Sequence, residues 1–232
     1  VRVVLEGHLP DWLSAKDVAL FLAAQYTTEF ALYKSIEFSG PGASRMSLGE
    51  RVCLSTHAVE LGAKFGIFEY DAKTAEFLAK RRSLQHQLRW AQPLAADPDA
   101  VYSQQVRVDL EKLEPQVAKP HAFGNVVPVS KVRGISVDQA LVGSCANGRL
   151  EDFRSVAQVL KGKKVHPRTR FFIQPASWRV YRDCLEVGIF PELLDAGVQI
   201  LSPGCHICLG MQAKVADGEV CVTSTTRNHR GR

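Results

Sequence analysis

The chain has 232 residues, of which 46% are apolar and 23% are charged. This composition is typical of a globular protein, and it excludes a disordered chain, a collagen and a coiled coil. The formal net charge of +5 comes from 29 basic and 24 acidic side chains spread along the chain. Such a mild excess does not predict a nucleic-acid partner, although it suits a small acidic ligand.

Strands and helices mix in the first half of the chain. Apolar residues predict a strand over residues 1–5, and serine-led capping boxes predict helices over residues 14–24 and 48–63. Residues 71–82 predict a further helix. Residues 83–125 contain four prolines, so we expect irregular structure and a linker there.

The second half alternates between strands and helices with short links. This alternation predicts an α/β fold with mostly parallel sheets and helices on both faces. Apolar spacing predicts strands over residues 139–143, 170–174, 198–201 and 219–223, and helices over residues 150–160, 177–187 and 191–197.

These patterns predict two α/β domains, over residues 1–125 and 126–232. The chain begins with Val1 rather than Met, and its last motif runs into Arg232. We therefore expect both ends to be cuts within a longer protein. No apolar run reaches the roughly 18 residues of a membrane span, and no export signal stands out, so we expect a cytoplasmic protein without a membrane partner.

The six cysteines are too sparse for a disulfide scaffold. Cys53 and Cys184 lie in helical patterns and Cys221 lies in a strand pattern, and we predict all three to be buried thiols. The other three cysteines follow predicted strands and need a different explanation.

Unusual residues follow three of the predicted strands. Cys145 follows residues 139–143, Cys205 and Cys208 follow residues 198–201, and Arg227 follows the last strand. In open α/β sheets, ligands bind outside the carboxyl ends of the strands. We therefore expect three thiols and at least one guanidinium group to lie at one edge of the sheet.

The Cys205-x-x-Cys208 pair alone fits a redox dithiol, half of a zinc site or part of an iron–sulfur site. A third thiol at Cys145 favours a metal. Three thiolates on a four-iron cluster leave one iron open as a Lewis acid for a hydroxyl or a carboxylate. Arginine binds carboxylates through two parallel hydrogen bonds, so Arg227 fits the same chemistry. Zinc and a redox dithiol remain alternatives.

Three motifs carry a family resemblance. Residues 143–149 (Gly-Ser-Cys-Ala-Asn-Gly-Arg), residues 203–210 (Pro-Gly-Cys-His-Ile-Cys-Leu-Gly) and residues 226–232 (Thr-Arg-Asn-x-x-Gly-Arg) resemble the three signatures of the aconitase superfamily, in the family's order. Residues 148–152 and 161–167 look most like the branch that contains the large subunits of 3-isopropylmalate dehydratase and of the homoaconitases.

The resemblance implies a hydro-lyase that removes and adds water on a hydroxy di- or tricarboxylic acid. The branch implies exchange between 3-isopropylmalate and 2-isopropylmalate, as in leucine biosynthesis, with a homoaconitase- or aconitase-type substrate as the alternative. By resemblance, Cys145, Cys205 and Cys208 hold a [4Fe–4S] cluster. Its free iron would take the substrate hydroxyl and a carboxylate.

Further site residues come from the same resemblance. Arg227 and Arg232 match the family's substrate-binding arginines, and Glu60 matches a glutamate near the cluster that we take as catalytic. The family's general base is a serine on a swivelling domain, often a separate small subunit, and nothing in this chain matches it. We therefore expect a small-subunit partner and little or no turnover from this chain alone.

The sequence departs from the family pattern beside the predicted cluster. Ala146 replaces a threonine, His206 stands in place of a common glycine, and Thr56 and Thr226 replace asparagines. Residues around a cluster tune it strongly. A cluster- or zinc-binding domain without catalysis is the alternative function from a different class.

Overall fold

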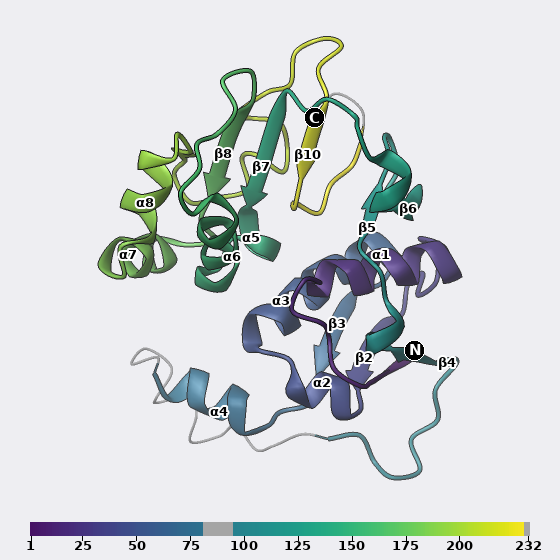
Figure 1. Cartoon of the computed structure of the whole chain (residues 1–232). Coiled ribbons are helices and arrows are strands. Elements are labelled where there is room, and N and C mark those ends of the chain that lie inside the picture. The colour runs from purple at the N-terminus through teal and green to yellow at the C-terminus, as the bar shows by residue number, and fades with distance from the viewer. Residues whose placement is uncertain (81–94, 230–232) are drawn as a thin grey trace. The chain divides into compact units, whose positions relative to one another are not determined.

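A computed structural model describes residues 1–80 and 95–229 of the chain. The chain divides into two compact units, Val1–Gln116 and Val117–Arg232, and Figure 1 shows the elements of each. The division falls earlier in the chain than the boundary that we place after residue 125. In the described residues, no helix is long and apolar enough to cross a membrane.

The first unit contains a four-stranded parallel sheet in the order β3-β2-β1-β4. Its strands are β1 (Arg2–Glu6), β2 (Ser35–Ser39), β3 (Phe65–Phe68) and β4 (Gln105–Asp109). The prediction finds β1 and misses β2 and β3. The expectation of irregular structure over residues 83–125 is wrong where β4 forms, and residues 81–94 lie outside the described residues.

The described helices of the first unit are α1 (Ala15–Tyr26), α2 (Pro41–Arg45), α3 (Leu48–His57) and α4 (Ala72–Ala79). Two of these four helices begin where the capping boxes predict, one falls within the predicted helix over residues 71–82, and the short helix α2 was not predicted. The backbone N–H of Glu50 donates to the Ser47 hydroxyl at 3.2 Å, at the start of α3. The predicted helix over 48–63 changes to a 3₁₀ helix (Ala58–Leu61) after α3, and the left-handed Gly62 ends it.

The second unit contains a second parallel sheet in the order β10-β7-β8-β9. Its strands are β7 (Gln139–Gly143), β8 (Arg170–Gln174), β9 (Gln199–Ile200) and β10 (Cys221–Thr223). The predictions of β7 and β8 are confirmed to the residue, and β9 and β10 are shorter than predicted. A two-stranded sheet pairs β5 (Gln116–Ala118) with β6 (Val126–Pro128).

Helices of the second unit pack into one apolar core. They are α6 (Leu150–Leu160), α7 (Trp178–Glu186) and α8 (Ile189–Asp195), and the short helix α5 (Ser144–Asn147) follows β7 outside this core. Phe153 of α6 and Phe190 of α8 are fully buried, with ring centroids 5.8 Å apart. Ile173 of β8 belongs to the same core. This packing makes β7 and β8 a firm base for the loops that follow them.

Candidate functional site

The parallel sheet of the second unit brings the predicted motifs to one edge. Cys145 follows β7, Cys205 and Cys208 follow β9, and Arg227 follows β10. All four strands of this sheet run in the same direction, so the loops leave the sheet at its carboxyl edge. We call these segments the first loop (residues 143–149), the second loop (residues 201–210) and the third loop (residues 224–229).

The first loop turns sharply out of β7. A Cβ atom on Gly143 would lie 2.1 Å from the carbonyl oxygen of Gln174, so only glycine fits at this position. Ser144 then adopts a left-handed φ of 69° and is fully buried. This strained turn starts α5 and places Cys145 at the surface of the loop.

The second loop is fastened to the end of β8 by a side chain that the sequence analysis missed. Gln174 is fully buried, and its Oε1 accepts the backbone N–H of Ile207 at 3.3 Å. Its Nε2 donates to the carbonyl oxygen of Ser202 at 2.9 Å and lies 3.3 Å from Nδ1 of His206. The one sequence signal for this role of Gln174 is its position at the end of a largely apolar strand.

The third loop is tied to both of the others. The backbone N–H of Gly143 donates to the Ser224 hydroxyl at 3.0 Å. The Thr226 hydroxyl lies 3.2 Å from the sulfur of Cys208, and both residues are 6% exposed. These contacts hold the third loop, where the chain leaves β10, against the two loops that carry the cysteines.

The Cys145 thiol lies within electrostatic range of the sulfurs of Cys205 and Cys208. Burial raises the pKa of the Cys145 thiol, and the neighbouring sulfurs of Cys205 and Cys208 raise it further. Cys145 and Cys205 are exposed, whereas Cys208 is buried. Within residues 1–80 and 95–229, no three His, Cys, Asp or Glu side chains stand close enough together to hold one metal ion. The three thiols therefore lie near one another, but they are not arranged to bind a single metal ion together.

The remaining predicted site residues lie in different places. Arg227 is exposed on the third loop, and Arg232 lies outside the described residues. Glu60 belongs to the first unit, where it is half-buried on the 3₁₀ helix that follows α3. Thr56 lies on α3, and its hydroxyl donates to the carbonyl oxygen of Cys53 at 2.8 Å.

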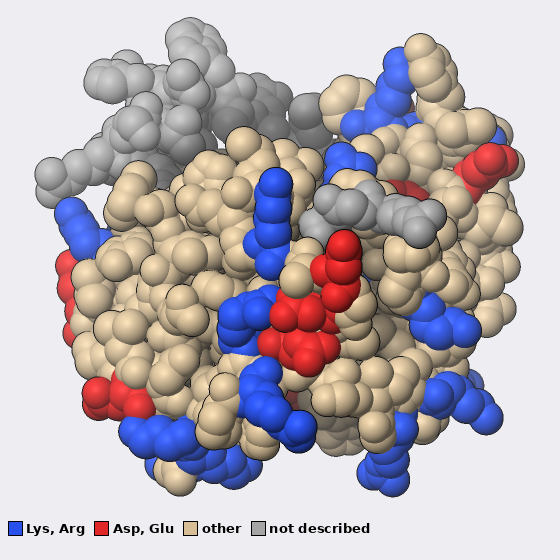
Figure 2. Space-filling view, turned by 90° about the horizontal axis from the view of Figure 1, so that it is seen from above, with Lys and Arg blue, Asp and Glu red and all other residues tan. Residues whose placement is uncertain are grey.

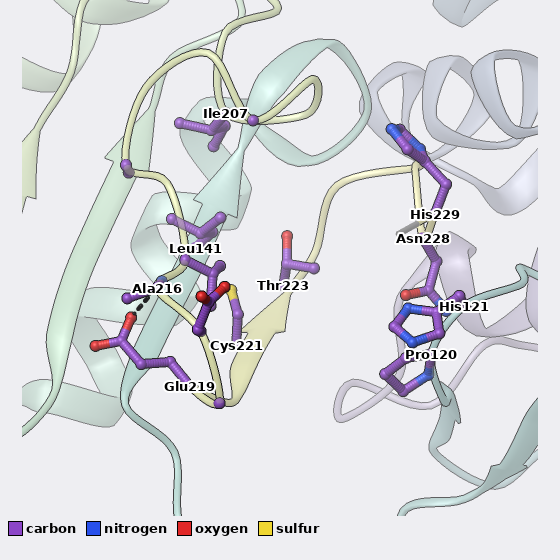
Figure 3. A pocket seen from close by; sticks show the side chains of 15 residues that line it. Pro120, His121, Leu141, Ile207, Ala216, Glu219, Cys221, Thr223, Asn228 and His229 are labelled. Carbon is purple, nitrogen blue, oxygen red and sulfur yellow. Dashed lines mark hydrogen bonds between the residues drawn. The ribbon is translucent and has the colours of Figure 1, made fainter. Parts of the chain in front are cut away.

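The prediction of buried thiols is confirmed for Cys53 and Cys184 and is wrong for Cys221. Cys221 is half-buried on the edge strand β10 and lines a pocket of about 330 Å³ in the second unit (Figure 3). Asn228, on the opposite side of this pocket, donates to the carbonyl oxygens of the segment before β6, including that of Lys119 at 2.9 Å. The pocket therefore lies beside the third loop.

Charged side chains are dispersed over the face seen in Figure 2, where acidic residues gather beside basic ones. In the second unit, Arg170 of β8 pairs with Glu219 at 2.6 Å. The hydrogen bonds from Arg170 lower the pKa of Glu219 to about 2, so both groups are ionised at neutral pH. Charge at this position is therefore paired rather than available to a ligand.

Comparison with known proteins identifies the family. The model of the aconitase family (aconitate hydratase) matches residues 1–134 and 130–232. The 3-isopropylmalate dehydratase large subunit 1 of Methanopyrus kandleri is 42% identical over 232 residues, which are 100% of this chain and 54% of that protein. The 3-isopropylmalate dehydratase large subunit of Wolinella succinogenes is 42% identical over 100% of this chain and 55% of its own length.

A third relative, the probable methanogen homoaconitase large subunit of Methanosarcina mazei, is 43% identical over 100% of this chain and 58% of its own length. The chain thus spans about half the length of the curated relatives that it matches. The family model accounts for both units, and the matched relatives cover every residue. The chain belongs to the aconitase family.

Proposed function

We propose that this chain is part of a hydro-lyase that removes and adds water on a hydroxy di- or tricarboxylic acid. The observation that carries the proposal is the set of three thiols and one arginine at the carboxyl edge of a single parallel sheet. Relatives that are named 3-isopropylmalate dehydratase large subunits favour 3-isopropylmalate as the substrate. A homoaconitase-type acid is the second candidate, because one relative bears that name.

We propose that the thiols of this edge hold a [4Fe–4S] cluster. Thiolates are the protein ligands that iron–sulfur clusters take, and Cys145, Cys205 and Cys208 come from loops that hydrogen bonds hold together. Two of these thiols are exposed, so iron and sulfide can reach them. When bound, a cluster with three protein ligands supplies an open iron that acts as a Lewis acid toward the substrate hydroxyl.

The remaining chemistry belongs to the protein's own side chains. The Arg227 guanidinium would bind a substrate carboxylate through two parallel hydrogen bonds and so orient the acid. We assign the same task to Arg232, and the role of catalytic carboxylate to Glu60, on the family resemblance. The exposure of Arg227 supports its role, because a ligand can reach it from solvent.

A partner is part of the proposal. The general-base serine of the family has no counterpart in this sequence, and the relatives are named large subunits. We therefore propose a small subunit that carries the swivelling domain. A reducing compartment such as the cytoplasm suits a site made of reduced thiols.

Anaerobic reconstitution with iron and sulfide tests the proposal. We expect about four irons per chain, the absorption of an iron–sulfur cluster, and a paramagnetic three-iron form after mild oxidation. Cys145→Ser should abolish assembly, whereas Cys221→Ser, a cysteine of the same unit outside the proposed ligand set, should leave it intact. Tight zinc uptake without a cluster, or a cluster that survives Cys145→Ser, would overturn the proposal.

A further inference from the structure

A buried hydroxyl group lies against one of the proposed ligand sulfurs. Oγ1 of Thr226 is 3.2 Å from Sγ of Cys208, and each residue is only 6% exposed. Water therefore has little access to either atom. A hydrogen bond in such a dry setting is electrostatically stronger than one exposed to solvent.

The chemistry of Cys208 decides the direction of this hydrogen bond. A neutral thiol can donate or accept weakly, and so can a hydroxyl group. A thiolate has no proton, so it can only accept. Once Cys208 is a thiolate ligand, the Thr226 hydroxyl must be the donor, and the bond becomes a charge-assisted one of the stronger class.

The third loop holds Thr226 in place for this contact. The Ser224 backbone N–H donates to the Leu141 carbonyl oxygen at 3.0 Å, and the Ser224 hydroxyl accepts from Gly143. The Thr225 backbone N–H donates to the Thr223 hydroxyl at 3.1 Å. The branched side chain of threonine has few χ1 rotamers. The hydroxyl group is therefore oriented before any ligand binds.

We propose that Thr226 is a positioning residue that sets the reduction potential of the cluster through the sulfur of Cys208. This inference rests on the proposed function, since it requires the cluster. Adding one electron to [4Fe–4S]²⁺ gives [4Fe–4S]⁺ and places more negative charge on the ligand sulfurs. A hydrogen-bond donor stabilises the reduced form more than the oxidised form, so it raises the potential.

Spectroelectrochemical titration of the reconstituted full chain measures this effect. Thr226→Val removes the donor and keeps the shape of the side chain. We expect the reduction potential of the cluster in this variant to be lower by about 59 mV, which corresponds to a tenfold change in the equilibrium constant of a one-electron reduction. Thr226→Ser keeps the hydroxyl group and should restore a potential close to that of the wild type.

Thr225→Val is the matched control. Thr225 is 1% exposed, and its hydroxyl lies 2.9 Å from the Thr223 hydroxyl. We expect its potential to equal that of the wild type. An equal shift in Thr225→Val would mean that any lost buried hydroxyl has this effect, and it would overturn the inference.

The outcomes separate this inference from the proposed function. A wild-type chain that takes up no cluster overturns both. A cluster that forms in every variant with one common potential overturns the role of Thr226 and leaves the proposed function standing. If Thr226→Val fails to load, Thr226→Ala provides the same measurement. If both fail while Thr226→Ser and Thr225→Val load, Thr226 serves assembly rather than tuning, and the inference is wrong.

Discussion

Gln174 is the residue on which the second loop depends. Its buried carboxamide binds the backbone of Ile207 and Ser202, which lie on either side of Cys205. Gln174→Leu would leave the buried N–H of Ile207 without this partner, at a cost of about 1–3 kcal/mol, and would remove the hydrogen bond to the Ser202 carbonyl oxygen. We expect a lower free energy of unfolding in urea and reduced iron uptake on reconstitution.

Gln199→Leu is the control for this prediction, because Gln199 is exposed on the neighbouring strand β9. It should change the unfolding free energy by less than about 0.5 kcal/mol, as surface substitutions usually do. Equal stability and equal iron uptake in the two variants would show that Gln174 does not hold the loop.

His57 makes the first unit sensitive to acid. The ring is fully buried, and its Nδ1–H donates to the Cys53 carbonyl oxygen at 2.7 Å. Burial lowers the pKa of His57 from 6.5 to about 3, and the charge of Lys16 contributes in the same direction. Below pH 6.5 His57 binds a proton in the unfolded chain but not in the folded chain. The free energy of unfolding therefore falls as the pH falls toward 3.

The loss predicted for His57 is about 1 kcal/mol between pH 7 and pH 5.5, from the slope of 1.36 kcal/mol per pH unit. Denaturant unfolding at several pH values measures it. His57→Gln should remove this part of the pH dependence, whereas His8→Asn, which changes an exposed histidine of the same unit, should retain it. A wild-type slope in His57→Gln would contradict the assignment.

Single residues also mark the limit of the sequence analysis. Motif spacing was enough to predict that Cys145, Cys205 and Arg227 follow strands of one sheet, because a parallel sheet sends such loops to one edge. Gln174 and Ser224 were not predictable in the same way. Their roles depend on hydrogen bonds to loops about 30 and 80 positions away in the chain. Local sequence patterns do not reveal contacts between residues so far apart.

At the scale of elements, the first turn of α6 contains a half-buried acid, Asp152, whose partial desolvation costs stability at neutral pH. The Asp152 carboxylate accepts the backbone N–H of Arg149 at 2.8 Å at the start of this helix. Burial nevertheless raises the pKa of Asp152 from 3.8 to about 6. The folded chain therefore binds the extra proton between these values, and stability from this group falls as the pH rises from about 4 to 6.

Asp152→Asn should remove this dependence, since an amide keeps an oxygen acceptor for the helix N-terminus and has no charge to bury. The effect amounts to about 3 kcal/mol over the whole window by the same conversion of pKa into free energy. The difference in unfolding free energy between variant and wild type, measured at pH 4 and pH 7, tests it. Glu151→Gln changes the exposed acid next to it and should give no such difference.

Elements differ in how well the sequence predicted them. β7, β8 and α6 are confirmed to the residue because their apolar spacing is strong and their neighbours are clear turns. β4 alternates apolar and polar residues but lies close to several prolines, which hid it. β3 is a short apolar segment whose residues are all exposed or half-buried. Its sequence therefore did not show which residues face the core, and the strand was not predicted.

At the scale of the whole molecule, the proposed cluster ligands and the contacts that hold their loops belong to the second unit. The three cysteines, Gln174 and Thr226 all lie in Val117–Arg232. The first unit contributes one cysteine, Cys53, which is buried in its own core. On the proposed function, cluster assembly should therefore not depend on the folding of the first unit.

We therefore expect a chain of residues 117–232 to take up iron and sulfide with the same stoichiometry as the full chain, and a chain of residues 1–116 to take up none. Each unit has its own parallel sheet, and a domain with its own core can fold alone. Circular dichroism first establishes that each part folds, and iron and sulfide analysis follows. A folded 117–232 chain that binds no iron, beside a full chain that does, would mean that the first unit supplies a group that the cluster needs, with Glu60 the first candidate to replace.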